Sequence, residues 1–155
     1  MTTPDPALKK GSNLMIFGGL IFAAYAVAFG VRSLSGTGFE IGVPTLNGVT
    51  RADLDALNPA IMAYVTHLHL ALAGFIAATS VAVIALCHYG VRQGLWWAWL
   101  TAMIAPVVGL AAALPEHYMG GFELNWVSHL GPVYLGTLIF VAGGLWALTG
   151  LMKPQ

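Results

Sequence analysis

The chain has 155 residues, of which 58% are hydrophobic and only 8% are charged, and its six Lys and Arg residues balance its six Asp and Glu residues. Because soluble domains carry about 25% charged residues, this composition indicates an integral membrane protein. The zero net charge excludes nucleic-acid binding, which depends on clustered Lys and Arg, and the single cysteine, Cys87, excludes an internal disulfide or a CxxC motif.

Four long apolar segments dominate the sequence, at about residues 14–34, 60–89, 95–114 and 130–151. Each is long enough to cross a hydrocarbon core of about 30 Å as a helix that rises about 1.5 Å per residue. Lipid offers no hydrogen-bonding partners to the backbone, so each segment must be helical. We therefore predict an all-α integral membrane protein, a four-transmembrane-helix bundle that forms a single domain over residues 1–155.

The first apolar segment shares features with signal peptides. Lys9 and Lys10 precede it, and it contains the small-residue run AYAVA at residues 24–28. Its apolar run continues past that point to Leu34, which is longer than a usual signal core. We therefore expect this segment to be retained as the first helix of the bundle.

The connections between the segments are unequal. Residues 90–94 form a very short turn, whereas residues 35–59 and 115–128 form two long connections on the opposite side that carry most of the polar residues. In the first long connection, Thr50 is followed three residues later by Asp53. This spacing predicts the capping box of a short helix that ends before Asn58 and Pro59.

Loop charges predict the orientation in the membrane. Four crossings put both termini on one side, and a larger set of basic residues falls there than on the other side, which has only Arg32 and Arg51; the larger set is Lys9, Lys10, Arg92 and Lys153. The positive-inside rule then places both termini in the cytoplasm and the long connections outside. We expect the protein in the cell (inner) membrane of a bacterium.

The second segment begins with HLHLALAGF at residues 67–75. Counting back about 20 residues from the inner end near Tyr89 places His67 and His69 at the outer membrane interface. On a helix these two side chains point about 160° apart. The His67 face continues through small residues, which let membrane helices approach closely, so we predict that His67 points into the bundle and His69 points toward lipid or a neighbouring subunit.

The third and fourth segments bring further histidines to the same level. Glu116 and His117 follow the third segment directly, and His129 directly precedes the fourth. Imidazoles with a carboxylate suit zinc, copper or non-haem iron, so His67, His117, His129 and Glu116 form a candidate metal site. The competing interpretation is that these histidines only pack at the membrane interface and that Glu116 is a solvated acid at a helix end. Haem held by His67, His129 or His117 is one alternative, with His67 and His129 as the first candidates, and proton transfer by imidazoles without a metal is another. The outer loops offer Glu40 and further polar groups as supporting residues.

The stretch HLHLALAGF resembles the HxHxxLxG helices on which haem-copper oxidases and nitric oxide reductases place metal ligands. The resemblance covers residues 67–75. It implies that histidines of this helix hold a metal ion or a haem iron.

Motifs of other chemistries are absent from the sequence. There is no GxSxG elbow, P-loop or HExxH motif, and no Cys/His nucleophile pair, because Cys87 lies near the inner side, so covalent catalysis is unsupported and enzymatic activity stays open. We predict an accessory or structural subunit of a membrane complex, which forms a homo-oligomer or joins a larger assembly in the lipid bilayer. The alternative is a metal- or haem-binding membrane protein in electron transfer or oxidoreduction at the outer leaflet.

Overall fold

The structure, a computed structural model, describes residues 5–153, and these form helices and loops with no β-strand among them. Four helices are long and apolar enough to cross a membrane, which confirms the predicted all-helical fold with four candidate spans. The helices are α1 (Pro6–Leu34), α2 (Arg51–Leu57), α3 (Pro59–Tyr89), α4 (Trp96–Tyr118), α5 (Trp126–His129) and α6 (Gly131–Leu151), with a 3-10 turn (Val91–Gln93) between α3 and α4.

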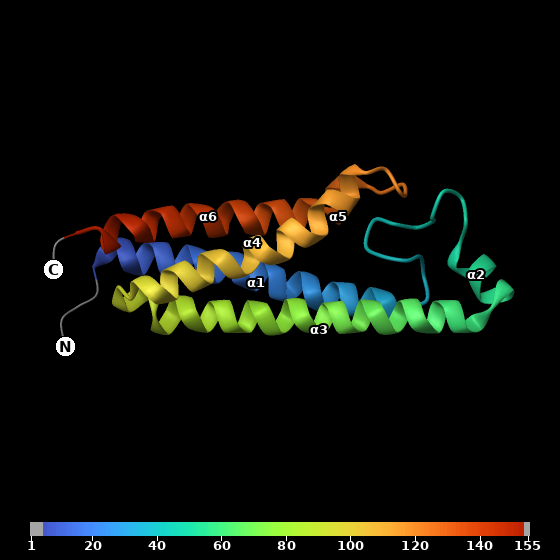
Figure 1. The fold of residues 1–155 in the computed structure, drawn as a ribbon, viewed down its shortest axis with the longest axis horizontal. Coiled ribbons are helices and arrows are strands. Elements are labelled where there is room, and N and C mark those ends of the chain that lie inside the picture. Colours follow the sequence, from blue (N-terminus) through green and yellow to red (C-terminus); the bar gives the residue numbers. More distant parts are fainter. Residues whose placement is uncertain (1–4, 154–155) are drawn as a thin grey trace.

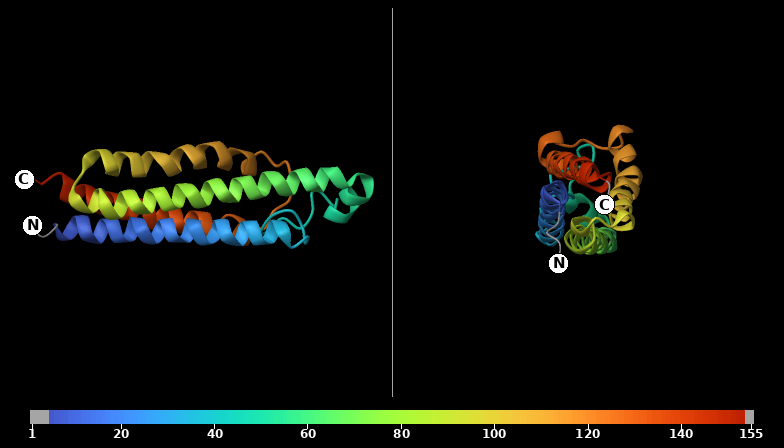
Figure 2. Two further views of the ribbon diagram at one scale, coloured as in Figure 1. Left: turned by 90° about the horizontal axis from the view of Figure 1, so that it is seen from below. Right: turned by 90° about the vertical axis from the view of Figure 1, so that its left-hand side faces the viewer.

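The four long helices lie side by side in one elongated bundle, with both ends of the chain at the same end of the molecule (Figure 1). α1 packs extensively against α6 and α3, whereas α4 touches α3 and only sparsely α6. The buried residues of α4 are Ala98 and Ala102, both near its start. Figure 2 shows that α4 lies on the outside of the bundle, next to α3 and away from α1. The outer part of α4 therefore has few neighbours within the chain.

The contact between α1 and α6 depends on glycine. A Cβ atom on Gly143 of α6 would lie 2.7 Å from the carbonyl oxygen of Gly11 and from the backbone nitrogen of Met15. One on Gly18 of α1 would lie 2.8 Å from the carbonyl oxygen of Gly136. The two backbones are therefore in direct contact, and close van der Waals packing of this kind holds helices together where lipid removes the hydrophobic driving force.

Polar contacts join the chain ends and the short turn at one end of the bundle. Lys153 donates to Asp5 across 2.8 Å, so the two termini are tied together. Arg92, in the turn between α3 and α4, donates to Asn13 and to Ser12 of α1. Arg92 and Lys153 are two of the four basic residues that the sequence assigns to one side of the membrane. Both lie at this end of the bundle.

Apolar side chains gather in two separate clusters. One lies in the half of the bundle that carries the chain ends and contains Met15, Val83, Cys87, Val91, Ala102, Phe140 and Ala147. The other joins the two long connections to α3 and contains Phe39, Val43 and Met62, with Leu46, Leu54, Val65, Phe122 and Leu124 around them. The second cluster makes the long connections an ordered cap over one end of the bundle.

The first long connection is built from tight turns. Asn47 and Gly48 both have positive φ, at 50° and 86°, and join Leu46 to Val49 through two backbone hydrogen bonds. This is the Asn-Gly pattern of a type I′ turn. The predicted capping box is confirmed: Thr50 and Asp53 exchange hydrogen bonds at the start of α2. The second connection is shorter than predicted, because α4 continues through Pro115 to Tyr118 and α5 occupies its end.

We predict that Gly143→Ala destabilises the bundle, whereas Gly109→Ala does not. A methyl group on Gly143 overlaps the α1 backbone, and overpacking of this kind costs about 1–3 kcal/mol, whereas one on Gly109 of α4 meets nothing within 4 Å. Thermal unfolding in detergent, followed by circular dichroism, measures the difference. Equal midpoints for the two variants would contradict the close contact between α1 and α6.

Candidate functional site

Glu40 lies on a tight turn of the first long connection. The backbone N–H of Val43 donates to the Glu40 carbonyl oxygen over 3.1 Å, and that of Phe39 donates to the Val43 carbonyl oxygen over 3.0 Å. Phe39 and Val43 are both buried and pack with Met62 of α3. These anchors hold the half-buried carboxylate of Glu40 beside the bundle, where histidines from α3, α4 and α5 surround it.

His69 faces the bundle and meets Glu40. Its Nε2 atom lies 3.3 Å from Oε1 of Glu40, and its ring centroid lies 5.2 Å from that of Phe29 on α1. His67, two residues earlier on α3, is exposed. The prediction that His67 points into the bundle and His69 points away from it is therefore wrong, because the two faces are exchanged.

The reason for this exchange lies in how α1 and α3 fit together. α1 presents glycine to α3: the Cβ position of Gly30 lies 3.6 Å from Cβ of Ala73, and that of Gly19 lies 2.8 Å from the Ile84 side chain. A small-residue surface on one helix accommodates larger side chains from the other, so α3 needs no small face of its own. Its small face is left outside, where Gly74 has nothing within 4 Å. The inward face of α3 carries Met62, His69, Ala73, Ser80, Val83 and Cys87.

His129, the last residue of α5, joins the first long connection to the second. It is 1% exposed, and its Nδ1 atom lies 2.6 Å from the carbonyl oxygen of Ile41. Its Nε2 atom lies 3.7 Å from Oε2 of Glu40. Close by, the backbone N–H of Asn125 donates to the carbonyl oxygen of Gly42 over 2.9 Å. The position of Glu40 therefore depends on α5 as well as on its own turn.

His117, in the last turn of α4, forms a pair with His129. The two Nε2 atoms lie 2.8 Å apart, and the ring centroids lie 4.9 Å apart. Nδ1 of His117 lies 2.9 Å from the carbonyl oxygen of Ala113. A carbonyl oxygen only accepts, so Nδ1 of each ring must carry the hydrogen that it donates, to Ala113 in one case and to Ile41 in the other. In the neutral state of both rings, neither Nε2 atom then carries a hydrogen.

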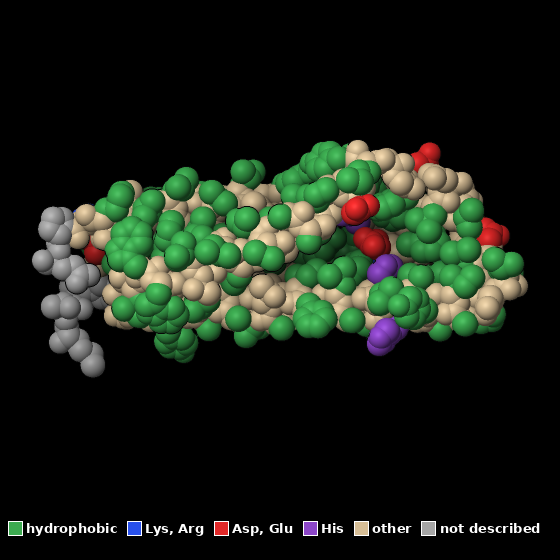
Figure 3. Space-filling model, viewed as in Figure 1, with side chains coloured by type: hydrophobic (Ala, Val, Ile, Leu, Met, Phe, Trp, Pro, Cys, Tyr) green, Lys and Arg blue, Asp and Glu red, His purple; other side chains and the backbone are tan. Residues whose placement is uncertain are grey.

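The structure thus brings together His69, His117, His129 and Glu40. Figure 3 shows histidine and acidic side chains gathered at one level of the molecule, in a hollow on an otherwise largely apolar face. Glu116 is exposed, and the ion pairs of this group are made by Glu40 instead. Consecutive residues on a helix point about 100° apart, so α4 cannot direct both Glu116 and His117 toward the group. The carboxylate of the cluster is Glu40, which the sequence indicated only as a supporting residue.

The surroundings of Glu40 favour its ionised form. Burial acts to raise the pKa of its carboxyl group, but the hydrogen bond from His69 and the charges that His69, His129 and His117 carry when protonated outweigh burial and lower the pKa below its ordinary value. A carboxylate in this position carries a negative charge at neutral pH. It can therefore balance one positive charge on the neighbouring imidazoles.

The predicted metal ligands do not form one set in this arrangement. Of the four, His117 and His129 meet, whereas His67 and Glu116 are exposed. Among residues 5–153, no group of three or more His, Cys, Asp or Glu side chains is arranged so that it could hold a metal ion. What the arrangement presents is a hydrogen-bonded pair of imidazoles with a carboxylate and a third imidazole beside it.

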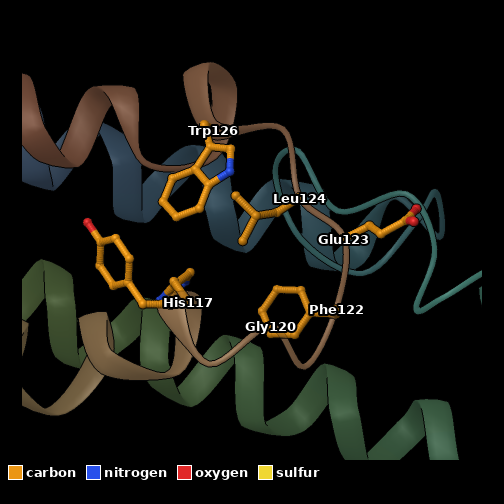
Figure 4. A pocket seen from close by; sticks show the side chains of 7 residues that line it. His117, Gly120, Phe122, Glu123, Leu124 and Trp126 are labelled. Carbon is orange, nitrogen blue, oxygen red and sulfur yellow. The ribbon is translucent and has the colours of Figure 1, made fainter.

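An open hollow of about 570 Å³ lies next to the histidine pair. His117 forms part of its wall, so one side of the pair is accessible from outside the bundle. Figure 4 shows the rings of Phe122 and Trp126 on different sides of the hollow, with Leu124 between them and the Glu123 carboxylate directed away. The complete lining is His117, Tyr118, Gly120, Phe122, Glu123, Leu124 and Trp126.

Comparison of the chain with protein-family models, curated proteins and solved structures gives no match.

We predict that Gly42→Ala loosens the first long connection, whereas Gly48→Ala does not. Both glycines have positive φ, at 80° and 86°, so an alanine meets the same backbone strain at each position. Only at Gly42 would the Cβ atom also meet neighbours, 2.7 Å from Oγ of Ser128 and 3.0 Å from Cβ of His129. Overpacking by about 1–3 kcal/mol should speed amide hydrogen exchange of Val43 and Asn125 by about five- to 150-fold.

Both variants place an alanine at positive φ and so carry the same backbone strain. The difference between their exchange rates therefore reports the contact of Gly42 with α5. Equal exchange rates at Val43 in the two variants would show that the connection does not pack against α5 as described.

Proposed function

We propose that this membrane protein holds and transfers a proton at the end of its bundle that carries the long connections, as part of a proton-coupled reaction. The observation that carries the proposal is the pair of Nε2 atoms of His117 and His129, 2.8 Å apart, whose Nδ1 atoms both donate to backbone carbonyl oxygens. Two lone pairs at this distance repel each other. One added proton converts the contact into an N–H···N hydrogen bond of ordinary length.

The charge of the shared proton is balanced locally. Glu40 lies 3.7 Å from Nε2 of His129, and the pKa of its carboxyl group is lowered, so its negative charge faces the positive charge of the pair. A neutral His69 then donates from Nε2 to the other oxygen of Glu40. The cluster as a whole is neutral with one shared proton. Such neutrality supports its position in a half-buried site, where an unpaired charge costs several kcal/mol, on the order of 3–5.

The cluster also offers a route for the proton. His69, Glu40, His129 and His117 follow one another at distances of 3.3, 3.7 and 2.8 Å, from α3 to the wall of the hollow. Imidazole changes its charge between about pH 5 and 8, which suits it to accept and release protons near neutral pH. A ligand atom that reaches Nε2 of His117 from the hollow would therefore take up or supply the shared proton, and Nε2 of His129 would exchange that proton with Glu40.

We also propose on which side of the membrane the histidine cluster lies. Lys9, Lys10, Arg92 and Lys153 belong to the end of the bundle that carries the chain termini, as the contacts of Arg92 and Lys153 support. By the positive-inside rule this end lies in the cytoplasm, and the histidine cluster lies on the non-cytoplasmic side of a bacterial inner membrane.

The roles predicted from the sequence stay predictions. The sparse packing of α4, whose buried residues are Ala98 and Ala102, agrees with an accessory subunit that packs against a partner or a second copy. The metal- or haem-binding alternative fits the pair less well. Two imidazoles on one tetrahedral zinc ion lie about 3.3 Å apart, and two axial ligands of a haem iron lie about 4 Å apart, whereas these Nε2 atoms are 2.8 Å apart.

We expect nuclear magnetic resonance of protein labelled with 15N in its histidines to show a strongly deshielded N–H proton on one or both Nε2 atoms of the pair at neutral pH. His117→Gln should remove this signal, because glutamine cannot share a proton in this way. His67→Gln and His88→Gln serve as matched controls, since both residues are exposed on α3, and should leave it unchanged. Circular dichroism of each variant confirms that the helices remain.

Two results would overturn the proposal. One is a spectrum in which both Nε2 atoms are unprotonated in the folded protein. The other is a stoichiometric amount of zinc, copper or iron in protein purified without a histidine tag, which would instead support the metal site predicted from the sequence.

A further inference from the structure

A second hollow runs along α4 and ends at the first. It has a volume of about 380 Å³, and its lining is almost entirely apolar: Val107, Leu110, Ala111, Leu114, Pro115 and Tyr118. These residues follow the three- and four-residue spacing of one helix face, so the hollow extends along the helix axis. From Val107 to Tyr118 this face covers about 16 Å at about 1.5 Å per residue. It belongs to a helix that is long and apolar enough to lie in a membrane.

Tyr118 forms a wall of both hollows. The apolar groove along α4 and the aromatic hollow beside His117 therefore meet at this ring, and together they form one elongated surface with two chemically different ends. The end along α4 suits a hydrocarbon tail. The other end is lined by aromatic rings and by His117, and suits a head group.

Flat rings line the head-group end. Tyr118 and Trp126 lie with their centroids 5.4 Å apart, and His117 and Phe122 with theirs 6.1 Å apart. Aromatic side chains prefer stacked or edge-to-face contacts with other rings. Among the residues that the structure describes, no Lys or Arg lines either hollow, and Glu123 is the charged residue of the lining. An anionic phosphate head group would therefore find no Lys or Arg side chain here, and the charge of the His117–His129 pair is already balanced by Glu40, whereas an uncharged ring would find matching surfaces.

The hydroxyl groups of Tyr118 and Tyr134 are hydrogen-bonded to each other. Within such a pair one hydroxyl hydrogen is used and the other is free to be donated. A ligand that carries oxygen atoms on its ring, as acceptors, would thus find a donor beside the place where the two hollows meet.

We propose that this surface binds a lipid-soluble quinone or quinol, with the ring in the aromatic hollow beside His117 and the hydrocarbon tail in the groove along α4. This class of ligand combines an uncharged planar ring, ring oxygen atoms and a long apolar tail, which are the three properties that the surface matches. Binding itself does not require the shared proton. The inference rests on the proposed function only where it names the ligand with which His117 exchanges a proton.

The test is fluorescence quenching by a benzoquinone with a ten-carbon tail, added to the protein in nanodiscs of zwitterionic phospholipid. Trp126 is the tryptophan at the outer end, because Trp96, Trp97 and Trp99 lie in the first turns of α4 and Trp146 lies near the end of α6. We expect a saturable component of quenching that Trp126→Phe removes. Trp97→Phe, at the other end of α4, should retain it.

Matched substitutions on α4 test the groove. Ala111→Phe fills it and should weaken quinone binding by at least about tenfold, whereas Ala112→Phe, on the next and exposed residue that does not line the groove, should leave binding unchanged. Ten-carbon alcohol, which has the tail without the ring, should compete poorly.

Quenching that rises linearly with quinone concentration, or equal affinity in Ala111→Phe and Ala112→Phe, would overturn the inference. Competition by the alcohol at the same concentration as by the quinone would also overturn it, because the surface would then bind acyl chains alone. These results are separable from those for the proposed function: the shared proton is observed by nuclear magnetic resonance without any quinone present.

Discussion

The hydrogen bond from Nδ1 of His129 to the carbonyl oxygen of Ile41 is the contact on which the site depends. It spans 2.6 Å and joins α5 to the first long connection. It fixes the hydrogen of His129 on Nδ1, so that Nε2 is directed toward His117 without one. It also holds the turn that carries Glu40. One buried contact therefore sets the tautomer of an imidazole, the position of a carboxylate and the docking of a loop.

The bundle beneath the site is held together by shape, with little help from polar groups. Glycines on α1 and α6 bring two backbones into contact, and glycines on α1 receive larger side chains from α3. The apolar cluster of the bundle and that of the cap are separate, and the histidines lie between the two. The site thus occupies the level at which helix packing gives way to loop packing, where polar side chains can be enclosed without crossing the apolar centre.

Hydropathy and helix signals were enough to predict the four long helices and the capping box of Thr50, because both depend on local sequence. The level of His117 and His129 followed from their positions at helix ends. The facing of His67 and His69 did not follow, since it depends on which surface α1 offers to α3. The role of Glu40 did not follow from the sequence for a similar reason. The position of its side chain depends on buried Phe39 and Val43 and on the hydrogen bond from His129 of α5 to the Ile41 carbonyl oxygen, and a periodic pattern encodes neither.

The uneven packing of α4 has a mechanical consequence. Its start is fixed by buried Ala98 and Ala102 and by the hydrogen bond from Trp99 to the Gly144 carbonyl oxygen. No residue of its far end is buried, and His117 and Tyr118 meet the rest of the chain through side-chain contacts with the second connection, α5 and α6. The start of α4 is therefore held more firmly by the rest of the chain than its far end is. A small rotation of α4 about its fixed start moves the far end more than the start, so it changes the separation of the two imidazoles.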